Sequence, residues 1–448
     1  MITAERNQMM FMPPSINEWL PEDHLAVFVA EIVDRLDLSA LEEQYRGSGK
    51  TAFSPGLLLS LLFYGYSTGV FGSRKIEKAT YDSVAFRYLS GNTHPDHDTI
   101  ATFRKRFLNE LKQLFSQILL IAREMGFAKV GTIAVDGTKM RANASKHKAM
   151  SWGYAQRLEK QLRREIESLL RKSEQADVIE AEESLDIPEE IRLREKRLSK
   201  IEEAKRAIEE RAQQRHVEAM KQHEERLRRR QETKDRTSRG VGGKPSQPPV
   251  ERGPEDTDQY NFTDADSRIM KSKGGFEQCY NGQVAVDVED MLVVGTSLTN
   301  SSDDNNSLIP TLHAVSQRTN DVPGTVVADA GYMSEANVVA CESSNIEAYI
   351  ALGREQHNVP LRKRLKGKHG TSRLKSALKT MMWKRLQSEF GKEIYKVRKS
   401  TVEPVFGIIK EVMGVRRFLL RGMANVSGEW DLVCLSYNLK HLHRLAMG

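Results

Sequence analysis

Two segments of this chain share one design, and together they restrict the fold more than any other feature. Residues 132–137 read TIAVDG and residues 325–331 read TVVADAG, so each is an apolar run that ends in an aspartate with a glycine close behind. A short, continuous apolar run is typical of a strand buried on both faces. A strand that ends in Asp places its carboxylate at the edge of a sheet, where the chain turns and substrates bind. We therefore expect an α/β sheet with Asp136 and Asp329 at strand ends.

A third acidic residue, Glu403, lies in residues 395–410, which read YKVRKSTVEPVFGIIK and look like the start of a helix. Hard cations such as Mg²⁺ take oxygen ligands from a few carboxylates and leave room for substrate phosphates. Asp136, Asp329 and Glu403 are therefore the candidate catalytic and metal-binding residues. Taken singly, each has a plainer interpretation: the two aspartates as turn residues, and Glu403 as a carboxylate favoured by a helix N-terminus.

Residues 16–128 have the spacing of several short helices. Apolar residues recur at helical intervals over residues 25–36 and 57–62, the second run after the start signal Ser54-Pro55. Further helices are expected over residues 74–90 and from about residue 98 towards residue 125. We assign residues 1–128 to an all-α N-terminal domain. A helix-turn-helix-like DNA-binding bundle and a plain helical bundle both fit this pattern.

Residues 151–235 are rich in charge and predict a helical hairpin that is inserted into the sheet domain. Apolar positions 158, 162, 166 and 169 mark one amphipathic helix, and a long charged helix runs from about residue 188 to 231, after a break over residues 176–187. This hairpin either contacts DNA or another subunit, or is a solvated spacer. Residues 236–258 contain many Gly, Pro and Ser residues and predict a flexible linker.

Strand patterns resume after the linker. Residues 279–288 and 291–298 predict an antiparallel hairpin, followed by a helix (304–317), a strand (325–328), a helix (334–341), a strand (346–351) and basic helices from about residue 375. With the strand over residues 130–135, this order predicts a mixed sheet of about five strands with flanking helices. The sheet domain therefore comprises residues 129–150 and 259–448.

These motifs resemble those of the DDE transposases of bacterial insertion sequences, whose catalytic domain is ribonuclease H-like. Asp136 matches the first aspartate of that family, Asp329 in Asp-Ala-Gly-Tyr the second, and Glu403 the glutamate. Tyr395, Arg398, Glu403 and Lys410 are similar to the Tyr-Arg-Glu-Lys signature of one large group. Four residues separate Arg398 from Glu403 here, where the signature has three.

The resemblance implies an insertion-sequence transposase of the bacterial cytoplasm. Such an enzyme would bind terminal inverted repeats and catalyse DNA cleavage and strand transfer with two Mg²⁺ ions, for which Mn²⁺ would substitute. Its partners would be double-stranded DNA at the element ends and the target, and a second copy or more in the synaptic complex. Two alternatives stay open, a ribonuclease H-like metal nuclease without strand transfer and a non-catalytic DNA-binding remnant. The candidate DNA contacts are Lys139, Arg141, Tyr395, Arg398, Lys410, Arg416 and Arg417.

The composition and charge of the chain restrict which partners, compartments and ligand sites we expect. The net charge of +7 and the isoelectric point of about 9.1 favour a polyanionic partner. Three unpaired cysteines, no signal-peptide core and no apolar run of membrane length predict a reduced, cytoplasmic protein without a membrane partner. No Walker-type phosphate loop is present, so we expect no nucleoside triphosphate site. We interpret Asp96 or Asp98, beside His94 and His97, as a helix cap, and Asp264 and Asp266 as turn residues.

Overall fold

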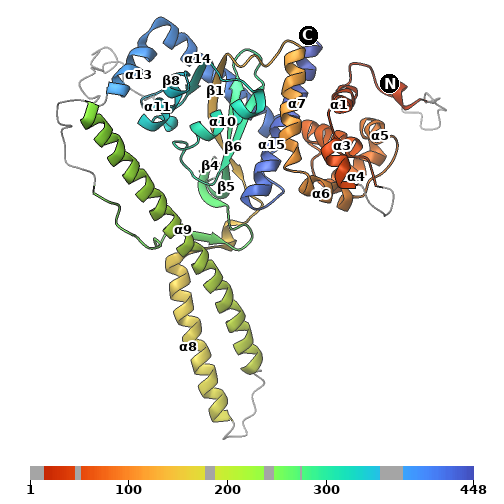
Figure 1. The fold of residues 1–448 in the computed structure, drawn as a ribbon. Coiled ribbons are helices and arrows are strands. Elements are labelled where there is room, and N and C mark those ends of the chain that lie inside the picture. Colours follow the sequence, from red (N-terminus) through yellow and green to blue (C-terminus); the bar gives the residue numbers. More distant parts are fainter. Residues whose placement is uncertain (1–14, 46–51, 177–186, 237–246, 273–274, 354–376) are drawn as a thin grey trace, which may run out of the picture. The chain divides into compact units, whose positions relative to one another are not determined.

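The computed structural model describes residues 15–45, 52–176, 187–236, 247–272, 275–353 and 377–448. They form two compact units, which are drawn in Figure 1. We call them the sheet unit, Met1–Asn143 with Ile269–Gly448, and the arm unit, Ala144–Arg268. No helix among the described residues has both the length and the apolarity that a membrane crossing requires.

Six strands form one mixed sheet in the order β4-β5-β1-β7-β8, with β6 paired to β5. The pairs β1–β7 and β7–β8 are parallel, whereas β1–β5 and β5–β6 are antiparallel. The predicted mixed α/β sheet is therefore confirmed, with one strand more than expected, because the segment before β5 forms β4. The strands are β1 (Thr132–Arg141), β4 (Arg268–Ser272), β5 (Gly275–Asp287), β6 (Val293–Thr299), β7 (Thr325–Ala328) and β8 (Glu347–Ile350).

Helices pack against the strands, which explains the continuous apolar runs. The helix α14 contacts β1, β5 and β7, and α10 and α15 contact β6. Ile133, Ala134 and Val135 of β1 are consequently inaccessible to solvent. Side chains of an isolated, one-sided sheet would instead alternate between buried and exposed positions. The helical elements after β6 are α10 (Leu308–Thr319), η4 (Ala330–Tyr332), α11 (Glu335–Ser343), α13 (Ala377–Gln387), α14 (Glu389–Gly407), the π-helical turn η6 (Ile408–Val412) and α15 (Met423–Ala446).

The N-terminal helices belong to the same compact unit as the sheet: α3 packs on α15, and α7 packs on α10 and α15. The expected helix start at Ser54 is confirmed, because the Ser54 side chain accepts from the Leu57 N–H and Pro55 is the first helical residue. The helical elements are η1 (Ile16–Glu18), α1 (Leu25–Asp34), α2 (Ser39–Glu42), η2 (Glu43–Tyr45), α3 (Pro55–Thr68), α4 (Ser73–Asp82), α5 (Val84–Leu89), α6 (His97–Arg106) and α7 (Glu110–Glu124).

Two expected helices are each divided in two. The helix over residues 74–90 breaks at Ser83, whose backbone is extended, and the one that continues towards residue 125 breaks after Arg106. The capping interpretation at the start of α6 is confirmed, since the Asp96 carboxylate accepts from the Thr99 N–H at 2.6 Å. His97 pairs with Glu77 on α4.

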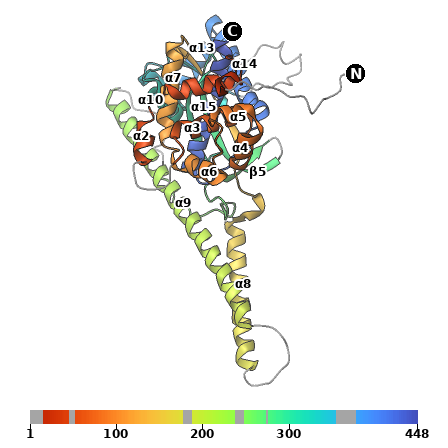
Figure 2. The same cartoon turned by 90° about the vertical axis from the view of Figure 1, so that its right-hand side faces the viewer.

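The arm unit consists of two long helices, α8 (Trp152–Ala176) and α9 (Ile187–Arg236), that lie side by side in both views (Figures 1 and 2). These two helices correspond to the helical hairpin predicted over residues 151–235. The expected break falls mainly on residues 177–186, and the linker partly on residues 237–246, both outside the described residues. Ala155, Leu158 and Leu162 of α8 pack against Ile201 of α9. The remaining elements are η3 (Lys146–Lys148), β2 (Ala149–Ser151) and β3 (Gln259–Asn261).

The middle of α9 is fixed to the segment that follows the linker. The Arg211 guanidinium donates to the carbonyls of Gln259 and Ala265, and Arg215 pairs with Asp258. Asp264 lies in the turn after β3, where its carbonyl accepts from the Ser267 N–H. The turn interpretation of this segment is therefore confirmed.

Candidate active site

The register of β1 and β7 brings Asp136 and Asp329 together. The last pair of this parallel ladder is Val135 with Ala328, and Asp136 and Asp329 are the next residues along the chain. Strands in a sheet lie about 4.8 Å apart, so the two side chains start from neighbouring positions. The prediction that the strand ends at Asp136 is wrong, however. β1 continues to Arg141, because the long strand β5 pairs with it as far as Cys279.

Asp136 is held from two sides. One carboxylate oxygen, Oδ1, accepts from the Gly137 N–H at 2.8 Å, and the other, Oδ2, accepts from Arg398 Nη1 at 2.9 Å. Burial raises the pKa of Asp136 to about 6, although Arg398 acts in the opposite direction. The carboxylates of Asp329 and Asp304 raise it further by repulsion. The site therefore concentrates negative charge around a poorly hydrated carboxyl group.

Asp329 begins the short helical turn η4. Its Oδ1 accepts from the Gly331 N–H at 2.7 Å, an N-cap contact that fixes the carboxylate at the end of β7. A Cβ on Gly331 would lie only 2.9 Å from Asp329 Oδ1, so a side chain at this position would displace the carboxylate. This explains why Gly follows Asp so closely in the second motif.

A third carboxylate, Asp304, was missed by the sequence interpretation. Its Oδ1 accepts from the side-chain amides of Asn281 (2.7 Å) and Gln283 (2.8 Å), and Lys139 Nζ lies 3.6 Å away. Its Oδ2 lies 3.4 Å from the position that a Cβ on Gly331 would take, close to Asp329. The only sequence signal was its place at the start of the helix predicted over residues 304–317.

Tyr332 lies among these groups. Its ring is fully buried, and its hydroxyl donates to Gln283 Oε1. Burial raises the pKa of Tyr332, and the nearby carboxylates of Asp136, Asp304 and Asp329 raise it further. The hydroxyl therefore stays protonated and fixes the Gln283 amide in the orientation that donates to Asp304.

Glu403 does not join the three aspartates in the described structure. It is exposed on α14, whereas Arg398, Val402 and Val405 form the buried side of that helix. Arg398 and Glu403 are five residues apart, about 140° around a helix with 3.6 residues per turn, so they face different directions. Within the described residues, no three Asp, Glu, His or Cys side chains are arranged to hold a metal ion.

The predicted DNA-binding residues lie on β1, on α14 and in the segment after α14. Lys410 Nζ contacts Thr138 Oγ1 and donates to the Lys139 carbonyl, and the Phe418 N–H donates to the Arg141 carbonyl. The C-terminal segment thus lies beside β1 from Thr138 to Arg141. Of the other candidates, Arg416 pairs with Glu411, Arg417 is exposed beside Arg141, and Arg398 lies over the Tyr395 ring.

The donor set fits one hard cation at Asp136 and Asp329. Mg²⁺ in proteins is commonly held by one or two carboxylates together with substrate oxygens. A cation there would relieve the repulsion that raises the pKa of Asp136. The arrangement does not fit a second ion held by Glu403, since that side chain lies on another side of α14.

Comparison with protein families identifies the class. Residues 232–439 match the transposase DDE domain, and residues 14–106 match a second transposase domain, DUF772. Asp329 and Glu403 lie inside the first range, whereas Asp136 lies between the two ranges. No curated protein and no solved structure matched the chain. Both matched domains are those of transposases. The chain belongs to the DDE transposases of insertion sequences.

Proposed function

We propose that this transposase binds the terminal inverted repeats of its element and catalyses Mg²⁺-dependent DNA cleavage and strand transfer. The observation that carries the proposal is the position of Asp136 and Asp329 at the end of the β1–β7 ladder, in a chain with two transposase domains. The strand order supports a ribonuclease H-like catalytic domain, residues 129–150 with 259–448. In the proposal, residues 1–128 bind DNA, and two or more copies pair the element ends in the cytoplasm.

Asp136 and Asp329 would hold the cation. Glu403 is the proposed third ligand, and because it is exposed on another side of α14 in this structure, it would have to turn towards the two aspartates to bind. A bound divalent cation would activate the attacking oxygen and stabilise the charge that develops on the phosphate. For Asp136 to bind it with Oδ2, Arg398 must release that oxygen. A released guanidinium would be well suited to a DNA phosphate, because it presents several N–H donors in a planar fork.

Lys139, Arg141, Lys410 and Arg417 are the proposed phosphate contacts next to the carboxylates. Their common place along β1 and the segment beside it supports this role, because it surrounds a cluster of acidic side chains with cations. Contacts to phosphates would position the DNA without reading its sequence. Tyr395 and Arg416 complete the proposed surface.

The test is cleavage of labelled duplexes that carry the ends of the element, with Mg²⁺, Mn²⁺ or EDTA. We expect metal-dependent cutting at the ends and joined products with target DNA, both lost in Asp136→Asn and in Glu403→Gln. Glu393→Gln is the matched control, since Glu393 is an exposed residue of the same helix. Cleavage that survives Asp136→Asn would overturn the mechanism.

Two observations favour a second candidate, a transposase chain that binds DNA without cutting it. The Arg398–Asp136 contact and the exposed Glu403 are both features of an unassembled metal site. Binding to the element ends without cleavage in either metal would support this candidate. Cleavage without joined products would instead indicate a nuclease.

A further inference from the structure

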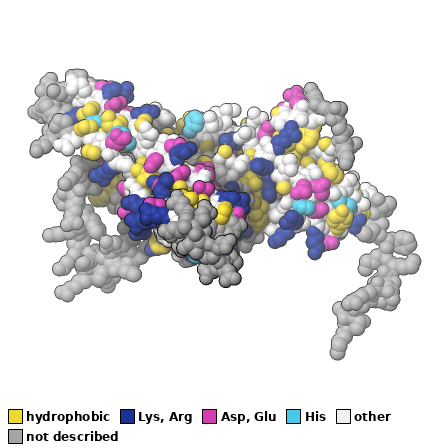
Figure 3. Space-filling view, turned by 90° about the horizontal axis from the view of Figure 1, so that it is seen from below, with side chains coloured by type: hydrophobic (Ala, Val, Ile, Leu, Met, Phe, Trp, Pro, Cys, Tyr) yellow, Lys and Arg dark blue, Asp and Glu magenta, His cyan; other side chains and the backbone are white. Residues whose placement is uncertain are grey.

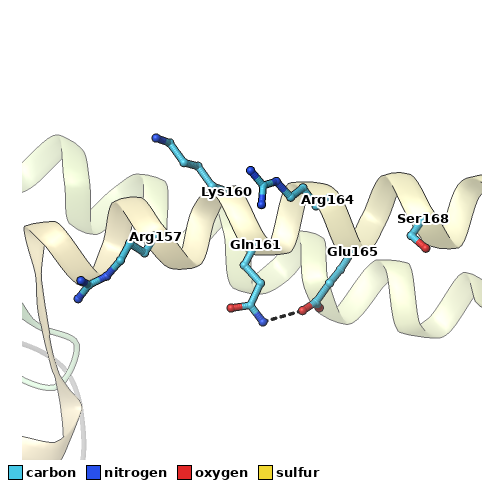
Figure 4. Close-up of a pocket in the computed structure, with 6 residues that line it drawn as sticks. All are labelled: Arg157, Lys160, Gln161, Arg164, Glu165 and Ser168. Atoms are coloured by element: carbon cyan, nitrogen blue, oxygen red, sulfur yellow. Dashed lines mark hydrogen bonds between the residues drawn. The ribbon is translucent and has the colours of Figure 1, made fainter.

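The exposed side of α8 carries three cationic side chains close together. Arg157, Lys160 and Arg164 lie on the side of the helix opposite Ala155, Leu158 and Leu162, which pack against α9. All three cations are exposed, and none forms an ion pair with a described residue. These three side chains line a hollow together with Gln161, Glu165 and Ser168, and Figure 4 shows all six on α8. We call this surface the α8 basic face, defined by Arg157, Lys160 and Arg164.

The carboxylates that are described on α8 are already neutralised. Glu159 pairs with Lys205 at 2.8 Å, Glu165 with Arg194 at 2.9 Å, and Glu167 with Arg171 at 2.7 Å. The first two of these cations come from α9, so the ion pairs lie along the seam between the helices. The cations of the α8 basic face are therefore left without carboxylate partners on their own helix.

A helix that is merely solvated usually mixes both signs on its outer face, because opposite charges three or four residues apart stabilise it. The outer face of α9 has this mixed character, with Glu210, Glu218 and Lys221 around a second hollow. Acidic and basic side chains are likewise interspersed on the face shown in Figure 3. Charge of a single sign at these positions of α8 is therefore a local feature.

The spacing suits a polyanion with regularly placed charges. Arg157 and Arg164 are two helical turns apart, about 10 Å along the axis, with Lys160 between them. Arginine and lysine are the usual partners of DNA phosphates, and a nearby hydroxyl such as Ser168 adds a donor. We propose that the α8 basic face binds the phosphate backbone of double-stranded DNA. This inference rests on the proposed function, which provides DNA as the partner.

The test compares two triple variants of the full chain. Arg157→Gln, Lys160→Gln and Arg164→Gln together remove the α8 basic face. Arg171→Gln, Arg192→Gln and Arg228→Gln remove the same charge from exposed arm residues that each pair with a glutamate of their own helix. Binding to a duplex of arbitrary sequence is measured by fluorescence anisotropy at several salt concentrations, and helix content by circular dichroism.

Each phosphate contact contributes about 0.9 to the slope of log affinity against log salt. We expect the first variant to lose about 2 to 3 from this slope and at least about tenfold in affinity at 0.1 M salt. The control should keep the slope of the unsubstituted chain. Equal slopes for both variants would overturn this inference but not the proposed function. A change in oligomeric mass without a change in slope would also overturn it, and would assign the α8 basic face to contact with a second copy of the chain. A complete lack of DNA binding by the unsubstituted chain would overturn the proposed function as well.

Discussion

Arg398 on α14 and Asp136 on β1 form an ion pair of 2.9 Å although 262 residues separate them in the sequence. The arginine is almost fully buried, so this contact orients α14 against the sheet. It also occupies one oxygen of the carboxylate that we propose as a metal ligand. Asp136 is therefore neutralised by the protein itself where Asp304 and Asp329 repel it.

Replacing Arg398 should leave the repulsion that Asp304 and Asp329 exert on Asp136 without its main opposing charge. In Arg398→Gln, Asp136 loses its counter-charge, and we expect the free energy of unfolding at pH 8 to fall by about 1–3 kcal/mol, less than for a fully buried pair because Asp136 is partly solvated. Mn²⁺ should raise the melting temperature more in this variant than in the unsubstituted chain. The control is Lys396→Gln, an exposed pair partner on the same helix. Equal responses to Mn²⁺ would contradict competition between Arg398 and the cation.

Asp304 should control the pH at which the site binds a cation. A carboxyl group must lose its proton to bind metal, so Mn²⁺ affinity should rise with pH through the pKa of Asp136, about 6. Asp304→Asn keeps an acceptor for Asn281 and Gln283 but removes a repelling charge, so the midpoint should move to lower pH. Electron paramagnetic resonance of free Mn²⁺ measures it. The neighbouring exposed Asp303→Asn should leave the midpoint unchanged, and an unmoved midpoint in Asp304→Asn would refute the coupling.

Asp287 at the end of β5 should make stability depend on pH. It is fully buried, its Oδ1 has no hydrogen-bond partner, and burial raises its pKa to about 6. An unfolded Asp has a pKa near 3.9, so above pH 6 the folded chain bears the cost of a buried charge that vanishes below about pH 4. Asp287→Asn should therefore stabilise the fold by about 2 kcal/mol at pH 8 and hardly at pH 4. Urea denaturation at both pH values measures this, and an equal gain at both would exclude charge as the cause.

Gly137 should tolerate no side chain. An added Cβ would overlap Gln283 Nε2 and lie 2.8 Å from Asp304 Oδ1 and 3.0 Å from Asn281 Oδ1. We expect Gly137→Ala to destabilise the fold by about 1–3 kcal/mol, as overpacking does in other cores. Gly131→Ala is the control, because nothing lies within 4 Å of its Cβ position. The melting temperatures of both variants are compared by thermal unfolding. Equal values would show that the side chains of Gln283, Asp304 and Asn281 move aside at little energetic cost.

The strand-then-Asp pattern was sufficient to predict that the apolar runs before Asp136 and Asp329 form strands of one mixed sheet. An apolar run predicts that its own residues are buried, and the apolar residues of both β1 and β7 are buried in the structure. The same pattern does not predict which strands pair with each other, or over how many residues they pair. The extension of β1 beyond Asp136 depends on the length of β5, which lies far away in the sequence.

The surroundings of the site could not be predicted for a related reason. The side-chain amides of Asn281 and Gln283 on β5 donate to Asp304 and hold its carboxylate. Neither of these two residues belongs to a recognisable sequence motif. The signature spacing identified Arg398 and Glu403 but not their directions. A helix turns by about 100° per residue. One extra residue between them therefore turns Glu403 away from the side of α14 on which Arg398 faces the sheet.

The point at which the chain enters and leaves the arm unit has an evolutionary consequence. The sheet unit is interrupted between Asn143 and Ile269, just after β1 and within β4, and both strands are neighbours of β5. Strands on either side of a common neighbour are about 10 Å apart, a gap that a few residues span. An insertion or deletion of the whole arm at this point would leave the β1–β7 and β1–β5 ladders intact. The arm is therefore a module that an ancestral transposase could acquire in one genetic event without rebuilding its sheet.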